Sequence, residues 1–140
     1  MLKSPLIHPE ILSALGRNGH GSMILVADGN FPVAVKTPAS STKVFLNLAP
    51  GVCKTTEVLQ KLLATIPVER AIAMIPEAGP INDLHTEYRQ LLGKIPMTAI
   101  DKGLFYEHAG SGHNCLTIVT GDARRFANII LVMGVYSEEL

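Results

Sequence analysis

Runs of apolar residues alternate with amphipathic stretches along this chain. The apolar runs cover residues 23–27, 43–48, 71–75, 97–100, 114–120 and 129–133, and several are bounded by glycine, proline or asparagine. Continuous runs of this length are typical of strands buried on both faces of a sheet. The pattern therefore predicts six strands, of which the one over 43–48 is short.

The stretches between these runs predict four helices and one long loop. Between residues 54 and 66, apolar residues recur every third or fourth position, which is the spacing of one helix face. Further helices are expected from Pro9 to the glycines at 16–19, from Asn82, which can cap its first turn, to about residue 92, and over 101–108. Residues 29–42 are rich in glycine, proline and serine, which predicts a loop.

Strands that alternate with helices indicate an α/β domain with helices on both faces of the sheet. We expect one domain, residues 1–140, with a three-layer α/β/α arrangement around a mostly parallel or mixed sheet. Ligands of such folds usually bind at the carboxyl ends of the strands. Asp28 and Asp101 directly follow predicted strands and occupy that kind of position.

The composition is that of a neutral globular protein, with 47% hydrophobic and 17% charged residues. Twelve basic residues balance twelve acidic ones, so the charge favours neither nucleic acid nor an anionic membrane as a partner. No apolar run is long enough to span a bilayer, and the first residues lack the apolar segment of a signal peptide. The two cysteines, Cys53 and Cys115, lie far apart in sequence, which favours reduced, buried thiols in a cytoplasmic protein.

Cofactor and metal motifs give no signal. No glycine-rich segment has the spacing of a nucleotide-binding loop, and no two of the five histidines have the spacing of a helix-borne metal site. We therefore expect neither a cofactor nor a metal. A competing hypothesis, a metal-dependent hydrolase using His20, Asp28 and either His108 or His113, would require bound metal in the purified protein.

The apolar run 23–27 has a candidate site residue at each end. His20 lies between two glycines before the run, which leaves the imidazole unshielded, and Asp28 ends the run. Each is either an ordinary turn residue or a site residue. Seven residues lie between them, about 23 Å of extended chain. They can share one site only if the glycine-rich ends curl back or if two subunits contribute.

Three other positions give weaker signals. Lys102 lies in the first turn of a predicted helix, where a positive charge is slightly unfavourable for the helix dipole, and this favours a role in binding. Asn128 is either a turn residue at a strand edge or an amide that faces a ligand. Arg124 and Arg125 are expected to be an ordinary solvated pair.

Two segments resemble a known family. Gly19-His20-Gly21, followed by the apolar run and by Ala-Asp-Gly-Asn-Phe-Pro at 27–32, resembles the D-ribose pyranase / L-fucose mutarotase family. The segments 119–121, 126–131 and 134–135 match the end of that family's chain, whereas 33–95 is only loosely similar. The resemblance implies a cytoplasmic isomerase without a cofactor that acts on the cyclic forms of a free monosaccharide. It also implies ring-shaped homo-oligomers, often decamers, with sites near subunit contacts.

The resemblance assigns roles to single residues. It implies that His20 is the catalytic acid/base and that Asp28 binds the sugar. Lys102 matches a basic residue that is arginine or histidine in the family, and Phe126 and Asn128 match the family's Tyr-x-Asn sugar contact. Two departures are evident, because Phe126 lacks the hydroxyl and Lys102 offers a point charge instead of a planar fork.

Together these observations predict a cofactor-independent mutarotase. Such an enzyme interconverts anomers, or pyranose and furanose forms, by general acid/base opening of the sugar ring. Phe126 favours a 6-deoxyhexose such as L-fucose, because a methyl group needs no hydrogen-bond partner there. The alternative is a non-catalytic monosaccharide-binding protein of the same fold, which the missing tyrosine hydroxyl favours. Measured anomer exchange would distinguish the two.

Overall fold

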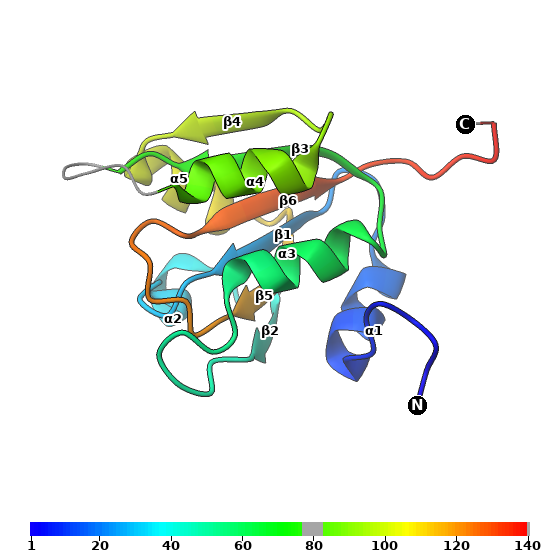
Figure 1. Ribbon diagram of the computed structural model, residues 1–140, viewed down its shortest axis with the longest axis horizontal. Helices are drawn as coiled ribbons and strands as arrows, with labels where there is room; N and C mark the ends of the chain where they lie inside the picture. Colours follow the sequence, from blue (N-terminus) through cyan, green and yellow to red (C-terminus); the bar gives the residue numbers. More distant parts are fainter. Residues whose placement is uncertain (77–82, 140) are drawn as a thin grey trace.

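The computed structural model describes residues 1–76 and 83–139, in which six strands form one sheet. The strands are β1 (Met23–Ala27), β2 (Thr42–Phe45), β3 (Val68–Met74), β4 (Met97–Ile100), β5 (Asn114–Val119) and β6 (Ile129–Met133). Their order across the sheet is β2-β5-β1-β6-β3-β4 (Figure 1). Strands β1 and β6 lie at the centre, and every residue of both is buried, as continuous apolar runs predict.

The direction of β6 divides the sheet into two parallel halves. Strands β2, β5 and β1 run parallel to one another, and so do β3 and β4. Strand β6 runs antiparallel between β1 and β3. The carboxyl ends of β1, β2, β3, β4 and β5 therefore lie at the same end of the sheet, together with the amino end of β6. The mixed sheet expected from the sequence is confirmed.

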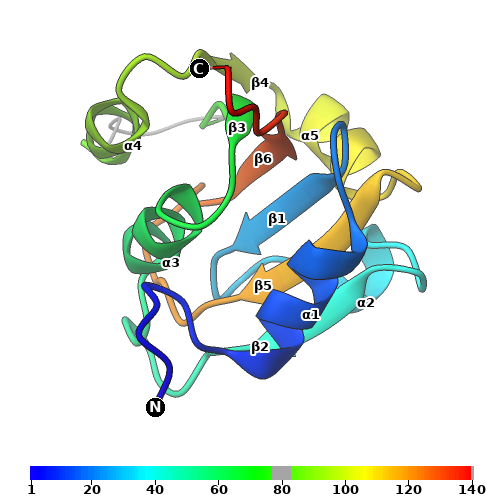
Figure 2. The ribbon, with the colours of Figure 1, turned by 90° about the vertical axis from the view of Figure 1, so that its right-hand side faces the viewer.

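Within the described residues, five helices cover the two faces of the sheet. They are α1 (Pro9–Arg17), α2 (Val33–Lys36), α3 (Thr55–Leu63), α4 (Leu84–Leu92) and α5 (Lys102–Ala109). Helices α1, α3 and α4 pack on one face, and α2 and α5 lie on the other (Figure 2). Along β1, Ile24 and Val26 join the first core, whereas Met23 and Leu25 join the second. The three-layer α/β/α arrangement is thereby confirmed.

The structure differs from the expected elements in several places, one of which is β3, which begins at Val68 and not at residue 71. Residues 33–36, expected to be part of a loop, form the single turn α2, in which the Lys36 N–H donates to the Pro32 carbonyl over 2.9 Å. The strand expected over 43–48 ends at Phe45, because β5, its one neighbouring strand among the described residues, ends opposite it at Val119. The expected helix cap Asn82 lies outside the described residues.

The two cysteines, expected to be reduced and buried, are free thiols that are only partly buried. Burial raises the pKa of both Cys53 and Cys115, which makes each a poor nucleophile at neutral pH. In the part of the chain that the structure describes, no helix has the length and apolar character needed to cross a membrane.

Candidate functional site

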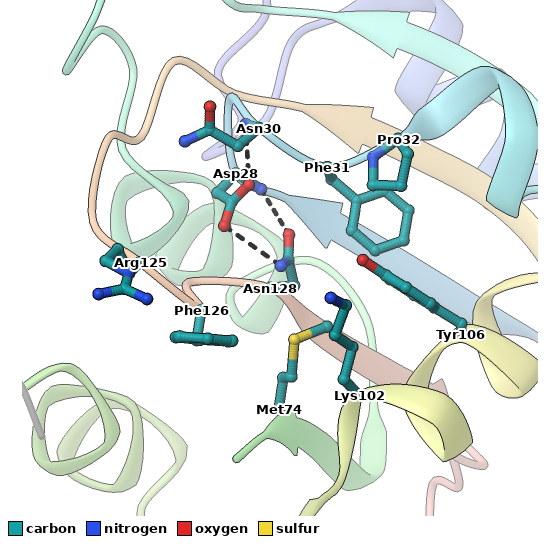
Figure 3. A pocket seen from close by; sticks show the side chains of 10 residues that line it. All are labelled: Asp28, Asn30, Phe31, Pro32, Met74, Lys102, Tyr106, Arg125, Phe126 and Asn128. Carbon is teal, nitrogen blue, oxygen red and sulfur yellow. Dashed lines mark hydrogen bonds between the residues drawn. The ribbon is translucent and has the colours of Figure 1, made fainter. Parts of the chain in front are cut away.

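A pocket of about 290 Å³ lies at the end of the sheet that is formed by the carboxyl ends of the parallel strands (Figure 3). Its polar lining consists of Asp28, Asn30, Lys102, Arg125 and Asn128, and its apolar and aromatic lining of Phe31, Pro32, Met74, Tyr106 and Phe126. These residues come from the ends of β1 and β3, the start of α5 and the segment that leads into β6. Of the five residues that the sequence singled out, all except His20 line this pocket.

Asp28 and Asn128 face each other in the pocket. The side-chain oxygen Oδ1 of Asn128 accepts the backbone N–H of Asp28 over 2.8 Å, and the side-chain nitrogen Nδ2 of Asn128 donates to Asp28 Oδ2 over 3.2 Å. They meet because β1 and β6 are antiparallel neighbours, with Val26 opposite Ile129. Burial raises the pKa of the Asp28 carboxyl, and a hydrogen bond of 2.9 Å from the Asn30 N–H partly offsets that effect.

Aromatic rings and cations form the sides of the pocket. The Phe31 and Tyr106 rings meet edge-on with their centroids 5.6 Å apart, and Lys102 Nζ lies 5.8 Å from the Tyr106 centroid. Across the pocket, the Arg125 guanidinium lies 5.5 Å from the centroid of the Phe126 ring (Figure 3). Phe126 has a φ of 61°, a left-handed conformation that is uncommon for a residue with a side chain. Such backbone strain occurs preferentially at functional sites.

A buried tyrosine of α4 hydrogen-bonds the segment that contains Phe126 and Asn128. The Tyr88 hydroxyl donates to the carbonyl of Ala127 and lies 2.6 Å from the Thr55 hydroxyl. Tyr88 and Thr55 are fully buried, and burial raises the pKa of the Tyr88 hydroxyl, which therefore stays protonated. This hydroxyl joins α4 and the start of α3 to the segment before β6 that carries Asn128.

Asp122 anchors the same segment through an ion pair. The Arg124 guanidinium binds its carboxylate twice, through Nε at 3.0 Å and Nη2 at 2.7 Å, and the Thr55 N–H donates to it over 2.9 Å. Burial alone would raise the pKa of Asp122, but the hydrogen bonds from Arg124 and Thr55 lower it to about 2. Asp122 is therefore ionised at neutral pH and keeps its hydrogen bonds to Arg124 and Thr55.

His20 lies at the other end of β1, outside the pocket. It occupies a tight turn in which the Ser22 N–H donates to the Gly19 carbonyl over 3.1 Å. Gly21 has a φ of 85°, which the third position of a type II turn requires and which glycine adopts without strain. The Gly21 N–H also donates to the carbonyl of Met133 over 3.0 Å, so the turn is attached to the end of β6. The ends of β1 do not curl back, and one chain does not bring His20 to Asp28.

The pocket suits a small ligand that has several hydroxyl groups and one apolar face. Asp28 and Asn128 can accept and donate hydrogen bonds, Lys102 and Arg125 bring positive charge, and the rings offer apolar surface. Among residues 1–76 and 83–139, no group of three histidine, cysteine, aspartate or glutamate side chains could hold a metal ion.

The sequence-based predictions missed some pocket residues and were wrong about one arginine. Met74 and Tyr106 line the pocket, but an apolar strand end and one ring of a short helix give no distinctive signal. Arg124 is not an ordinary solvated residue, because it binds the buried carboxylate of Asp122, whereas Arg125 is exposed, as expected, and lines the pocket. The acidic Asp122 two residues before Arg124 is the signal that could have indicated this pairing.

Comparison with known families identifies the chain. Residues 1–136 match the model of the RbsD / FucU transport protein family. The chain belongs to this family. The assignment agrees with the resemblance drawn from the histidine turn, the aspartate that ends β1 and the Phe-Ala-Asn segment before β6.

Relatives and solved structures of the RbsD / FucU family match nearly the whole chain. A D-ribose pyranase of Streptomyces coelicolor is 32% identical over 137 residues, which cover 97% of this chain and 99% of that protein. A human fucose mutarotase is 28% identical over 93% of this chain and 90% of its own. The Streptococcus pneumoniae fucose mutarotase in complex with L-fucose has a TM-score of 0.80 at 26% identity and covers 98% of this chain and all of that one. Bacillus subtilis RbsD complexed with D-ribose has a TM-score of 0.85 at 23% identity, with 98% and 100% covered, and shows the shared fold.

Proposed function

We propose that this protein is a cofactor-independent isomerase, a mutarotase that interconverts the cyclic forms of a free monosaccharide in the cytoplasm. The observation that supports this most directly is the hydrogen-bonded pair of Asp28 and Asn128 in a pocket of about 290 Å³. That volume lies at the small end of ligand pockets and suits one sugar ring. Family relatives are named as enzymes of this kind, and two solved members hold D-ribose and L-fucose.

Each pocket residue has a role in binding the sugar. Asp28 and Asn128 hydrogen-bond hydroxyl groups, and the positive charge of Lys102 stabilises negative charge on a sugar oxygen. Sugars also have apolar C–H faces, which pack against Phe31, Tyr106 and Phe126. Because Asp28 is 4% exposed, its bonds to the sugar are made with little competition from water.

The reaction needs one proton to move between two oxygens. His20, in its neutral form, takes the proton from the anomeric hydroxyl while the bond between the anomeric carbon and the ring oxygen breaks and the carbonyl forms. Lys102 stabilises the charge on the released oxygen until His20 returns the proton. The open chain then rotates and closes as the other anomer or with another ring size. No redox change and no bond to the enzyme are required.

Because His20 lies at the far end of β1, it acts on a sugar held by another subunit. We propose a closed homo-oligomer, a decameric ring as the family resemblance implies, in which the histidine turn of one copy faces the pocket of the next. The side chain of His20 is 60% exposed, so it is accessible to a second copy. Of the two arrangements that the sequence left open, curled ends of the strand or contributions from two subunits, we therefore propose the second.

The substrate we propose is a 6-deoxyhexose such as L-fucose. Phe126 lines the pocket where the family resemblance places a tyrosine hydroxyl. A sugar hydroxyl buried against this ring would lose its water partners, whereas a methyl group gains from the contact.

Exchange NMR with a panel of free aldoses tests the activity. Saturation of one anomer's signal transfers to the other only when the two interconvert, so added protein should increase the transfer for its substrate. His20→Ala should lower the exchange rate by about 100-fold or more, the usual scale for a lost general acid/base. The exposed turn position of His20 should leave folding intact, as circular dichroism would show.

Two results would contradict the proposal. Wild-type exchange rates in a folded His20→Ala protein would exclude the assigned acid/base. Absence of exchange with every aldose, together with saturable sugar binding, would favour the non-catalytic binding protein instead.

A further inference from the structure

A β-bulge lies beside the histidine turn. Strand β3 pairs with β6 so that Val68 lies opposite Met133 and Arg70 opposite Val132, which leaves Glu69 as an extra residue without a partner across the ladder. Gly134 makes room for this bulge, because a side-chain carbon there would come within 3.3 Å of the Glu69 nitrogen. Bulges commonly occur next to active sites, where they redirect a side chain.

The redirected side chain reaches His20. Glu69 Oε2 lies 2.9 Å from His20 Nε2, and the two residues are 49 positions apart in sequence. The end of β6 connects to both partners, because the Met133 carbonyl accepts the Gly21 N–H of the histidine turn over 3.0 Å and the Gly134 N–H donates to the carbonyl of Pro67, two residues before Glu69, over 2.8 Å. The backbone on each side of this hydrogen bond is therefore attached to one of two consecutive residues, Met133 and Gly134.

We propose that Glu69 is a positioning residue that selects the tautomer of His20. This inference rests on the proposed role of His20 as acid/base. A carboxylate only accepts hydrogen bonds, so neutral His20 carries its proton on Nε2 and donates a hydrogen bond from there to Glu69. Nδ1 is then the nitrogen with the free electron pair, and it is Nδ1 that takes the proton from the anomeric hydroxyl. Glu69 itself does not touch the sugar.

A second histidine–glutamate pair shows that proximity alone does not produce this arrangement. His8 Nδ1 lies 3.3 Å from Glu10 Oε2, but the two residues are sequence neighbours on an exposed helix start, and the same Nδ1 accepts the Ile11 N–H. Both pairs are exposed to solvent, so neither contributes much to stability, and their geometry is what distinguishes them. The Glu69 pair differs because it joins two segments far apart in sequence, at a bulge that Gly134 leaves room for and beside the end of β6. Glu10 therefore provides a matched control.

The test combines NMR of the free protein with kinetics. Two-bond proton–nitrogen correlation spectra, recorded well above the ordinary histidine pKa of about 6.5, identify which ring nitrogen bears the proton. The His20 signal is the one lost in His20→Ala. We expect the proton on Nε2 in the wild type, and a mixture of tautomers in Glu69→Gln, since an amide can both donate and accept.

The kinetic expectation separates positioning from a merely structural role. Glu69→Gln should lower kcat for anomer exchange by about ten-fold or more, part of the factor of about 100 that an acid/base provides, with KM unchanged. Glu10→Gln should change neither the His20 spectrum nor kcat. A wild-type His20 protonated on Nδ1, or an active Glu69→Gln protein with unchanged kcat, would overturn the inference. If the wild type exchanges no sugar, the proposed function fails, and the tautomer alone decides the role of Glu69.

Discussion

At the scale of single residues, Phe126 and Lys102 are the two pocket positions at which this chain departs from the pattern that the family resemblance implies. Phe126 presents a ring and no hydroxyl, while its neighbour Asn128 keeps both amide atoms engaged with Asp28. The Asp28–Asn128 pair therefore favours a polar part of the sugar, whereas the Phe126 ring favours an apolar part. One part of the ligand needs hydroxyl groups, and another part needs to be apolar.

Phe126→Tyr should reduce the preference for 6-deoxyhexoses. A hydroxyl buried against the phenyl ring costs roughly 1–3 kcal/mol, and a methyl group gains about 0.8 kcal/mol. The resulting preference of roughly 2–4 kcal/mol corresponds to about 30- to 1,000-fold in specificity. We expect the wild type to exchange fucose faster than galactose by such a factor, and the variant to narrow the gap because its hydroxyl gives the sugar hydroxyl a partner.

The two sugars provide an internal control for this prediction. A loss of folded protein lowers both exchange rates equally, so only a change in their ratio reports on the pocket. Equal rates for fucose and galactose, unchanged by Phe126→Tyr, would mean that Phe126 does not face the sugar's sixth carbon.

Individual site residues were predictable where they follow a strong local pattern. Asp28 and Asn128 flank continuous apolar strands, so the sequence alone places them at strand ends. Glu69 could not be found in this way, because its orientation depends on a bulge that arises only when β3 pairs with β6, some 60 residues later in the chain. Residues whose role depends on long-range pairing leave no signal in their own neighbourhood.

At the scale of elements, the irregular segment between β5 and β6 depends on the helices beneath it. Tyr88 of α4 and Thr55 of α3 hold its Ala127 carbonyl and its Asp122 carboxylate. The segment has no ladder of its own between Val119 and Ile129, so these side chains supply the hydrogen bonds that its buried backbone needs. The helix layer on one face therefore determines the shape of the pocket edge.

Tyr88→Phe should destabilise the protein by about 1–3 kcal/mol, because it leaves the buried Ala127 carbonyl and Thr55 hydroxyl without their shared partner. Urea denaturation measures the change in the free energy of unfolding. Tyr136→Phe is the control, since the Tyr136 side chain is 82% exposed and its hydroxyl can bond to water. Equal stability of the two variants would show that the buried hydroxyl contributes nothing to the fold.

The regular elements were predictable and the irregular ones were not. Continuous apolar runs gave β1 and β6, and the apolar stripe gave α3, since these patterns extend over a whole element. Helix α2 has only four residues, too few to show a helical period, and it was expected to be loop. The role of Arg124 was also hidden, because a charged pair in a loop resembles any solvated surface.

At the scale of the whole molecule, the pocket and the histidine turn lie at opposite ends of strand β1. The pocket gathers at the carboxyl ends of the parallel strands, and the histidine turn lies at the amino end of β1. The edge strand β2 and the segment after it also expose apolar surface, with Phe45 and Leu48 63% and 85% exposed. An unpaired edge with exposed apolar residues is commonly covered by another chain. Both features are explained by assembly of identical copies.

Mixed oligomers provide the sharpest test of this arrangement. We expect light scattering to give the mass of a closed homo-oligomer larger than a dimer, and His20→Ala and Asp28→Asn chains to be inactive when each assembles alone. If every site takes His20 from one copy and Asp28 from another, equal mixing of the two variants restores about a quarter of the wild-type activity, since each site draws the intact residue independently from either chain.

The double variant mixed with wild type is the matched control. Sites shared between copies again give about a quarter of the wild-type activity, whereas sites contained within one chain give about half, and the two single variants then restore nothing. A monomeric mass, or this second pattern of activities, would place His20 and Asp28 in one chain and refute the shared site. Restoration in both mixtures to the same extent would establish that the two ends of β1 work together only across a subunit boundary.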